Sequence, residues 1–446
     1  MRIVIAGAGE VGTHLAKMLS AEDHELIVID NDEERLKAVG SAFDLLTIEA
    51  NANSITHLKE AKISKADLFI GVTYSEDVNI NAAILSKKLG ARKTIARIDN
   101  QEYLLPAHQE LFRNLGIDYM IYPEKIAARE IVGLLAQTGS TEMVEFTGGK
   151  LHMYVIKLDE EAPIINKTLR EISPHDASLE YRAVAITRGG QTIIPSGDIQ
   201  FLVGDLVYVI SSQAGMKDLF KYSGKKQFEV RNIMILGGSR IGRKTAQNLG
   251  NQHYVKLIEK DRQRSYKLSN LLSNTLVIHG DGTNMELLKQ EGLDKMDAFI
   301  AVTGNSETNI LSCLLAKHLG VKRTIAEVEN IDYIHLAENI GVDTIINKKL
   351  ITASRIFRFT MSEEVSTIKC LTGTEAEVME FIVKPESPVT KGALKDIKFP
   401  NDAKIGGVIR GKNAFIAHGG TEIKPYDRVV VFALPGEIHT IGKFFN

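Results

Sequence analysis

The same unit occurs twice along this chain of 446 residues, and that duplication restricts the possible folds more than any other feature. The segment GAGEVG reappears as GGSRIG 230 residues later (237 − 7), and longer segments repeat near the same spacing. The matching pairs include HELIVID (24–30) with HYVKLIE (253–259), ADLFIGVT (66–73) with DAFIAVT (297–303), and LGIDYMIYPEKIAA (115–128) with IGVDTIINKKLITA (340–353). The sequence therefore predicts two similar units in tandem.

Each copy changes its pattern partway along. Residues 1–138 alternate short β-branched runs with polar-faced stretches of helix length, as in a parallel βαβ sheet. Residues 139–222 contain short strand-like runs separated by Gly, Pro and Ser, and the second copy divides likewise into 230–364 and 365–446. We expect an α/β protein with two tandem Rossmann-like, doubly wound parallel-sheet domains, each followed by a small α+β lobe rich in strands.

Composition narrows the classes of function. Lys and Arg total 54 against 56 Asp and Glu, so no basic excess draws the chain to nucleic acid or anionic lipid. The two cysteines, Cys313 and Cys370, form no CxxC pair, and no apolar run reaches the roughly 18 residues of a membrane helix. The chain opens on the strand-like MRIVIAG rather than on a signal peptide. We expect a soluble cytoplasmic protein whose membrane contacts, if any, go through a partner.

The first glycine motif has the full context of a dinucleotide-binding turn. Gly7, Gly9 and Gly12 lie between a predicted strand and helix, and Asp30 follows 18 residues after the third glycine (30 − 12). The glycines allow a tight turn, close approach of a pyrophosphate and close helix packing, and the helix amides from Glu10 onward favour an anion. Asp30 would accept from the adenosine ribose and repel a 2′-phosphate, which favours NAD(H) or an adenine nucleotide over NADP. The alternative is a turn that only packs helix on sheet.

The second motif departs from the first at its centre. It reads Gly237, Gly238, Ser239, Arg240, Ile241 and Gly242, with Glu259 at the acidic position. Ser239 narrows the approach of a phosphate, whereas Arg240 adds a cation beside it. The alternative is a vestigial site that keeps only the fold.

Further candidates fall at the carboxyl ends of later predicted strands, where open α/β sheets bind ligands. Thr73 and Thr303 end the fourth strand of each copy, and Tyr74 follows Thr73. Arg97 ends the fifth strand and could hold a phosphate, which Glu327 at the equivalent position cannot. Glu124 opens the helix after the sixth strand, where the second copy has Lys349, and either could be only a helix-terminal charge. The same is true of the strand ends, which could simply be solvated.

Catalytic machinery is absent from the sequence. There is no proton relay for a nicotinamide reaction, no zinc-ligand spacing, no nucleophile elbow and no P-loop, so we assign no catalytic and no metal-binding residue. Nucleotide sites joined to small lobes suit a non-enzymatic sensor, in which a ligand favours one of two arrangements. An NAD-dependent dehydrogenase of unusual lineage is the second hypothesis, and a scaffold with relic sites is the third.

The chain also resembles the TrkA family, the peripheral regulatory subunits of bacterial Trk potassium uptake systems. The resemblance spans essentially the whole chain and rests on GAGEVG, TIIPSGDIQFLVGDLVYVIS, EKDRQRSYKLS, GDGTNMELL and the duplicated layout. It implies two Rossmann-type domains and two small lobes of the RCK type. It also implies a homotetrameric ring on the cytoplasmic side of a TrkH-like membrane channel subunit, with NAD(H), or ATP and ADP, setting the gate.

The resemblance also implies nucleotide contacts in each copy. In the first copy they fall on Gly7, Ala8, Gly9, Glu10, Val11, Asp30, Thr73, Tyr74 and Arg97, and in the second on Gly237 to Ile241, Glu259, Asp281 and Thr303. Three positions depart from the family pattern: Asn51 stands where the second copy has Asp281, Asp99 replaces a second arginine, and Ser239 replaces a glycine. These departures weaken triphosphate binding in the first copy and leave occupancy of the second open.

Overall fold

The computed structural model describes residues 1–446 except 23, 137, 173–179, 213, 225–227, 361–364, 372–373, 375, 435–436 and 446. The chain divides into two compact units. One unit consists of Met1–Pro123, Lys349–Lys369 and Pro435–Gly442. The other consists of Glu124–Lys348, Cys370–Leu434 and Lys443–Asn446.

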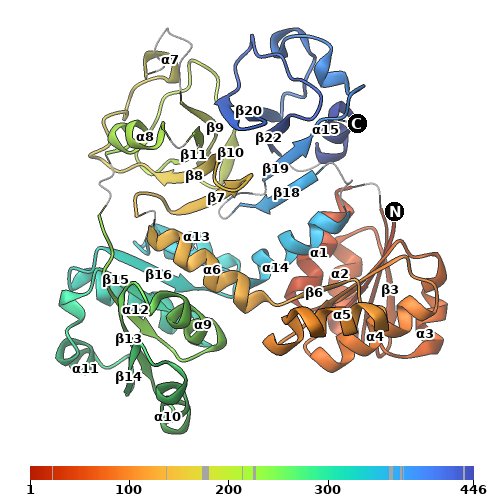
Figure 1. The fold of residues 1–446 in the computed structure, drawn as a ribbon, viewed down its shortest axis with the longest axis horizontal. Coiled ribbons are helices and arrows are strands. Elements are labelled where there is room, and N and C mark those ends of the chain that lie inside the picture. Colours follow the sequence, from red (N-terminus) through yellow and green to blue (C-terminus); the bar gives the residue numbers. More distant parts are fainter. Residues whose placement is uncertain are drawn as a thin grey trace. The chain divides into compact units, whose positions relative to one another are not determined.

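The first unit contains a six-stranded parallel sheet of order β3-β2-β1-β4-β5-β6 (Figure 1). The inner strands are continuous apolar runs with both faces covered; Ile3, Val4 and Ile5, for example, are fully buried. The strands are β1 (Arg2–Ala6), β2 (Glu25–Asp30), β3 (Leu46–Glu49), β4 (Leu68–Gly71), β5 (Lys93–Arg97) and β6 (Tyr119–Ile121). This is the strand order of a doubly wound dinucleotide fold.

Helices connect these strands, and their ends follow local sequence signals. Asp32 caps the second helix by accepting from Arg35 N, and Ser75 caps the fourth by accepting from Val78 N. Pro106 occupies the first turn of the fifth helix. The helices are α1 (Glu10–Ser20), α2 (Glu33–Ala42), α3 (Ile55–Glu60), α4 (Glu76–Lys88) and α5 (Pro106–Leu115).

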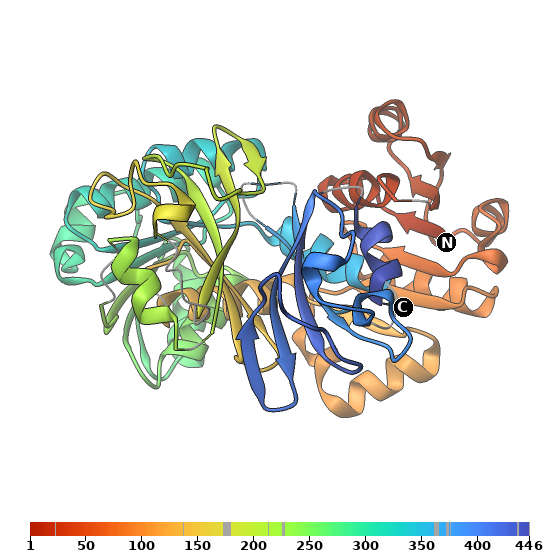
Figure 2. The ribbon, with the colours of Figure 1, turned by 90° about the horizontal axis from the view of Figure 1, so that it is seen from above.

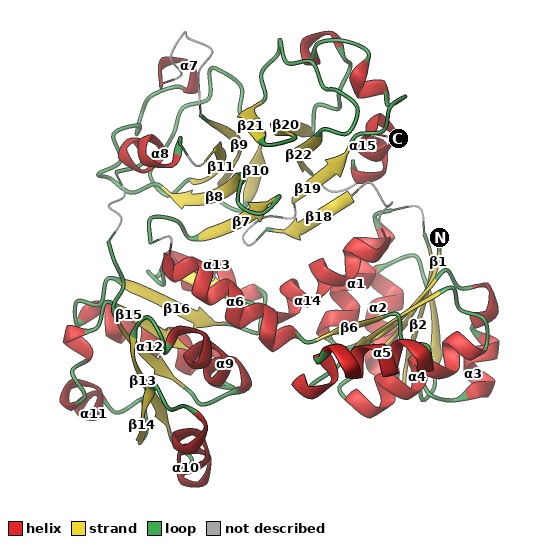
Figure 3. Ribbon diagram, viewed as in Figure 1, coloured by secondary structure: helices red, strands yellow, loops and turns green. Residues whose placement is uncertain are grey.

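The second unit contains a parallel sheet of the same kind, with order β14-β13-β12-β15-β16-β17 (Figure 3). Its strands are β12 (Asn232–Leu236), β13 (Tyr254–Glu259), β14 (Thr275–His279), β15 (Ala298–Ala301), β16 (Arg323–Glu327) and β17 (Thr344–Ile346). Its helices are α9 (Arg240–Leu249), α10 (Arg262–Leu271), α11 (Met285–Gln290), α12 (Ser306–His318) and α13 (Asp332–Asn339). The identical strand order confirms the predicted repeat.

The last helix of each parallel-sheet domain groups with the other copy. Helix α6 (Pro123–Ala136) follows β6, yet nearly all of it belongs to the unit of the second sheet. Helix α14 (Lys348–Phe357) follows β17, yet from Lys349 it belongs to the unit of the first sheet. In that unit the ring of Phe359, just after α14, lies 4.1 Å from the ring of Tyr119. The two copies have therefore exchanged a helix.

Each copy also has a small five-stranded lobe, and both lobes have one topology. The first lobe has order β10-β9-β11-β8-β7 and the second β18-β19-β22-β20-β21, so strands in equivalent positions pair alike. The first lobe contains β7 (Glu142–Phe146), β8 (Leu151–Lys157), α7 (Leu169–Ile172), β9 (Tyr181–Arg188), β10 (Gln191–Ile193), β11 (Leu206–Ser212) and α8 (Met216–Tyr222). The second contains β18 (Val365–Cys370), β19 (Glu377–Ile382), β20 (Ala403–Arg410), β21 (Asn413–Ile416), β22 (Arg428–Ala433) and α15 (Ile438–Phe445). The expected fold class is confirmed.

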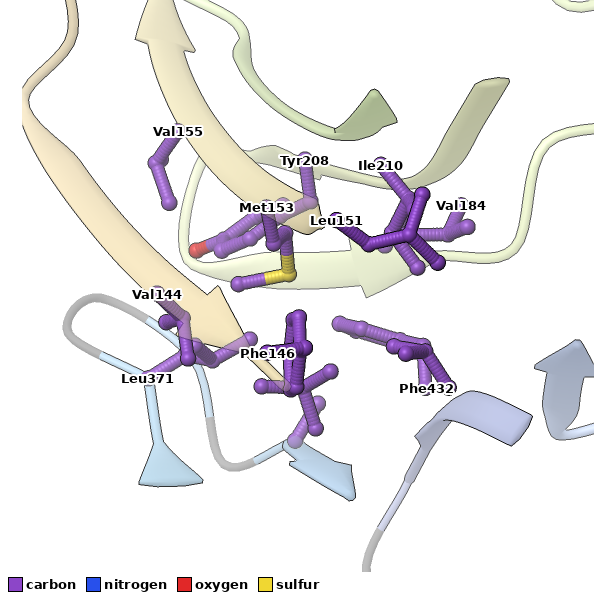
Figure 4. Close-up of a cluster of buried hydrophobic side chains, with 14 of the residues drawn as sticks. Val144, Phe146, Leu151, Met153, Val155, Val184, Tyr208, Ile210, Leu371 and Phe432 are labelled. Atoms are coloured by element: carbon purple, nitrogen blue, oxygen red, sulfur yellow. The ribbon is translucent and has the colours of Figure 1, made fainter. Parts of the chain in front are cut away.

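The two small lobes share one hydrophobic core. Phe146, Met153 and Tyr208 of the first lobe belong to the same buried cluster as Leu371 and Phe432 of the second (Figure 4). The Tyr208 and Phe432 ring centroids are 5.9 Å apart. The strands of the first lobe and those of the second accordingly lie side by side in both ribbon views (Figures 1 and 2). Among the described residues, no helix has the length and apolar character to cross a membrane.

Candidate functional site

The glycines of the first loop differ in whether packing requires them. Gly7 has φ +113°, and a Cβ there would lie 2.9 Å from Thr73 N, while a Cβ on Gly12 would lie 1.8 Å from the carbonyl oxygen of Gly7. Both glycines are thus needed to seat helix on sheet. A Cβ on Gly9 would meet nothing within 4 Å, so packing does not explain this glycine. Gly9 is also the N-cap of α1 and offers no side-chain acceptor to the first helix amides.

Asp30 is fixed beside this loop at the end of β2. Its Oδ2 accepts from Ala8 N at 2.5 Å and its Oδ1 accepts from Asp32 N at 3.0 Å, and the residue is 8% exposed. Each carboxylate oxygen can accept a further hydrogen bond. The carboxylate is therefore pre-positioned and still able to accept from ribose hydroxyls.

Thr73 and Arg97 are held at the same sheet edge by Asn79, which sequence reasoning missed. Asn79 is 1% exposed, and its Oδ1 accepts from Thr73 N (2.8 Å) and Thr73 Oγ1 (2.7 Å). Its Nδ2 donates to the carbonyls of Thr73 and Arg97, both at 3.1 Å. Asn309 makes the same four contacts in the second copy, to Thr303 and Glu327. The repeated spacing of Thr and Asn in TYSEDVN and TGNSETN was the available signal.

The Arg97 side chain has only one weak partner among the described residues. Its Nη2 lies 3.6 Å from Asp99 Oδ1, and its buried Nε has no acceptor there. A guanidinium with so few partners can donate two hydrogen bonds to one anion, such as phosphate. Tyr74, by contrast, is 94% exposed on the following turn.

The first loop receives a residue from the second copy. Lys349, near the start of α14, forms an ion pair with Glu10, the first residue of α1, and the Lys349 side chain is only 12% exposed. Val11 beside it is buried, so only its backbone can reach a ligand. The placement of Lys349 at the first loop could not be predicted from the sequence, because this residue belongs to the other repeat.

The second loop keeps the turn and changes its chemistry. Gly237 has φ +104°, and a Cβ on Gly242 would lie 2.0 Å from the carbonyl oxygen of Gly237, so the packing requirement is the same. Ser239 is the N-cap of α9, and its Oγ accepts from Gly242 N at 3.2 Å. The helix is thereby capped by its own side chain. Ile241 is buried and Arg240 is exposed.

The acid of the second copy lies against Gly238 and binds the loop as Asp30 does. Glu259 Oε2 accepts from Gly238 N at 2.9 Å, and Oε1 accepts from Asp261 N at 2.7 Å, which repeats the contacts of Asp30. A Cβ on Gly238 would lie 2.3 Å from Leu268 Cδ1 and 2.7 Å from Glu259 Oε2. Leu268 and the longer acid together therefore favour glycine where the first copy has Ala8.

The charge at the end of β16 is reversed relative to β5. Glu327 is 3% exposed, and its Oε1 lies 3.4 Å from Lys348 Nζ. Burial raises its pKa to about 7, with Lys348 opposing and with Glu329 and Glu124 reinforcing the rise. Glu124, from the exchanged helix α6, is itself 5% exposed, with no hydrogen-bond partner for its Oε2 among the described residues. This edge is thus a set of buried carboxylates rather than a phosphate site.

Asp281 lies just after β14 and contacts residues of its own neighbourhood. Its carboxylate pairs with Lys260 Nζ at 2.7 Å and accepts from the amide and hydroxyl of Thr283. These contacts hold its pKa at about 2. The described residues contain no group of three or more His, Cys, Asp or Glu placed to hold a metal ion.

Two parallel sheets of one strand order, each with a glycine turn at the switch point and an acid ending the neighbouring strand, define paired dinucleotide-binding domains carrying small β lobes. Comparison with known families gives the particular assignment: the chain belongs to the TrkA family. The TrkA-N domain model matches residues 3–123 and 233–348, and the TrkA-C domain model matches 153–224 and 378–446.

Relatives match along the full length. The Trk system potassium uptake protein TrkA homolog of Archaeoglobus fulgidus is 36% identical over 449 residues, covering 100% of both chains. The Trk system potassium uptake protein TrkA of Vibrio alginolyticus is 31% identical and covers 97% of this chain and 95% of its own. Both are potassium uptake proteins by name, not enzymes.

Solved structures confirm the fold. The GsuK RCK domain is 17% identical with a TM-score of 0.60, covering 100% of this chain and 94% of its own. The GsuK channel bound to NAD is 17% identical with a TM-score of 0.59, covering 100% of this chain and 78% of its own.

Proposed function

We propose that this chain is the non-enzymatic regulatory subunit of a membrane potassium uptake system and that it responds to NAD(H) or adenine nucleotides. The observation that carries the proposal is the full-length match to TrkA potassium uptake proteins, combined with a glycine loop whose central glycine has no packing role. The four domains are 1–138, 139–222, 230–364 and 365–446. The subunit acts at the cytoplasmic face of the membrane, as a homotetramer bound to a TrkH-like channel subunit.

The first loop is the principal nucleotide site in this proposal. The amides from Gly9 onward and Arg97 hold phosphate groups, and Asp30 accepts from the adenosine ribose. Lys349 adds positive charge beside Glu10 at the start of α1. A related channel structure was solved with NAD and another with ADP, which supports this ligand class.

The second loop takes a nucleotide more weakly. Ser239 already satisfies one helix amide, and buried carboxylates replace the cation at the end of the fifth strand. The groups that remain at the second loop are the backbone of Gly237 and Gly238 and the carboxylate of Glu259. They are enough to maintain the fold of the loop.

Regulation follows from differential binding. A nucleotide that binds one arrangement of sheets and lobes more tightly shifts the population toward it, and typical coupling of about 1–3 kcal/mol changes a partner's equilibrium 5- to 150-fold. Because α14 of the second copy reaches the first loop, occupancy of that loop acts directly on both repeats.

The test is co-purification with a TrkH-like subunit, followed by potassium flux into vesicles with and without NAD, NADH, ATP and ADP. We expect complex formation and a flux that depends on the nucleotide. A flux indifferent to every nucleotide, or steady hydride turnover by the isolated chain, would contradict the proposal.

A further inference from the structure

The first small lobe contains a cavity of about 460 Å³, all of whose lining residues belong to one unit. Its walls are largely apolar and come from β8, β9, β11, α8 and residues 158–172 and 195–201, with Ile156, Phe201 and Leu219 among them. Part of its rim comes from the second lobe, through Lys404 and residues 416–419. Its volume is within the range of small-molecule pockets, roughly 300–1,000 Å³.

Two cations line this apolar space. Arg182 on β9 donates to the carbonyl of Ala417 in the second lobe, and Lys404 on β20 donates to the carbonyl of Pro195 in the first lobe at 2.8 Å. The pairs are equivalent in the repeat, because 404 − 182 and 417 − 195 both equal 222. The two cations therefore lie reciprocally across the contact between the lobes.

Neither cation has a carboxylate partner among the residues that the structure describes. Burial lowers the pKa of both, and proximity to Arg182 further lowers that of Lys404, to about 8. Burying positive charge without a counter-ion is unfavourable, so an anion at this place would offset a cost that the fold already bears.

The second lobe shows that this cavity is not a requirement of the fold. Ile156 pairs with Val207 in β11, and Phe381 pairs with Val429 in β22, so Phe381 is the equivalent of Ile156 (429 − 207 = 222). Helices α8 and α15 also begin 222 residues apart, which makes Phe445 the equivalent of Ser223.

Aromatic rings fill the equivalent positions in the second lobe. Phe381 and Phe445 stack with centroids 4.4 Å apart, and both are fully buried. In the first lobe Ile156 and Ser223 line the cavity instead. At these two positions, one topology thus carries stacked rings in one lobe and borders a cavity in the other.

We propose that the cavity of the first small lobe binds a small amphipathic carboxylate, with its apolar body among Ile156, Phe201 and Leu219 and its carboxylate on Arg182 and Lys404. The two carboxylate oxygens match two cationic donors, and the apolar walls favour a hydrocarbon body over a hydrated one. Because the cations come from different lobes, such a ligand links the two lobes.

The test is calorimetric titration of the full-length protein with decanoate. Decan-1-ol and decyltrimethylammonium serve as neutral and cationic controls of the same chain length. We expect decanoate to bind with a stoichiometry of one, and both controls to bind at least tenfold more weakly. Equal affinity for decan-1-ol, or no binding of decanoate, would overturn the proposal.

Variants locate the site. Ser223→Phe introduces into the cavity an aromatic ring like that of Phe445 at the equivalent position of the second lobe, and it should abolish decanoate binding. Lys404→Gln should weaken decanoate binding roughly tenfold, because a charged hydrogen bond is lost. Lys412→Gln, an exposed lysine after β20, removes the same charge and should change nothing. Far-ultraviolet circular dichroism reports that each variant is folded. If Ser223→Phe fails to fold, Lys404→Gln decides, and decanoate binding unaffected by Lys404→Gln would refute the site.

Discussion

The two glycine turns of this chain have nearly the same backbone requirement and different chemistry at the helix that follows. In the first, Gly9 leaves the helix amides without a side-chain cap and Arg97 stands at the end of β5. In the second, Ser239 caps its own helix and the buried Glu327 stands at the end of β16. Packing has kept the glycines that seat helix on sheet, whereas the residues that would face a ligand have diverged. The motif alone therefore reports the fold, and the groups around it report the ligand.

The largest effect on stability should come from replacing the packing glycines, which both copies have. Gly12→Ala puts a methyl group 1.8 Å from a backbone oxygen and should lower the free energy of unfolding of its unit by more than about 3 kcal/mol. Gly242→Ala should do the same in the other unit. Urea unfolding followed by circular dichroism measures both, with Gly9→Ala as the control that meets open space. Equal stability of Gly12→Ala and Gly9→Ala would contradict the claim that packing requires glycine at position 12.

The pH dependence of the free energy of unfolding should distinguish the second site, with its buried Glu327, from the first. Burial raises its pKa from 4.5 to about 7, so the folded chain holds this proton more tightly than the unfolded chain does. The resulting stability is complete below pH 4.5 and is lost as pH rises through 7, by up to roughly 3 kcal/mol. Glu327→Gln should remove that loss in urea unfolding measured from pH 5 to 8. Glu286→Gln, an exposed control, should follow the parent protein, and a parallel pH profile for Glu327→Gln would contradict the assignment.

Removal of the ribose acid should weaken the first site. Asp30→Ala leaves the ribose hydroxyls and the Ala8 amide without their acceptor, and NADH or ADP affinity should fall by roughly 1–3 kcal/mol. Calorimetric titration measures the loss, with the exposed Asp44→Ala as the matched control. Unchanged affinity in Asp30→Ala would remove the first loop from the proposed function.

The smallest effect should come from exchanging the central residues of the two loops. Gly9→Ser should leave stability within a few tenths of a kcal/mol, because Gly and Ser differ little as N-caps. We expect it to weaken nucleotide binding by about 1 kcal/mol, since a capped amide is no longer offered to phosphate. Ser239→Gly should strengthen the second site in the same assay. If affinity does not respond at either position, Ser239 does not account for the difference between the loops.

Most of the fold could be predicted from the sequence because its signals are local. β-branched runs, glycine turns and helix caps recur at one period, and the structure confirms two doubly wound sheets and two small lobes. The exchange of α6 and α14 could not be predicted, since a helix carries the same periodic pattern whichever sheet it covers. The placement of Glu124 and Lys349 was missed for that reason.

The candidate site could be predicted in part. The loops and acids were found from spacing, but the coupling of Ala8 with Asp30, and of Gly238 with Glu259, depends on distances between side chains on separate strands. Asn79 and Asn309 lie six residues beyond the threonines that they hold, and only comparison of the repeats exposes that pattern. Whether these residues contact a nucleotide stays a prediction.

The exchanged helices also bear on ancestry. Trading an identical terminal element is how two copies of a single-unit protein form a swapped pair, and joining their genes end to end would fix that pairing in one polypeptide. Neither half could then be expressed alone without uncovering the surface that its sibling protects. In a fused chain the two halves no longer have to be self-complementary. Their binding sites can then diverge, so that one is retained while the other is lost.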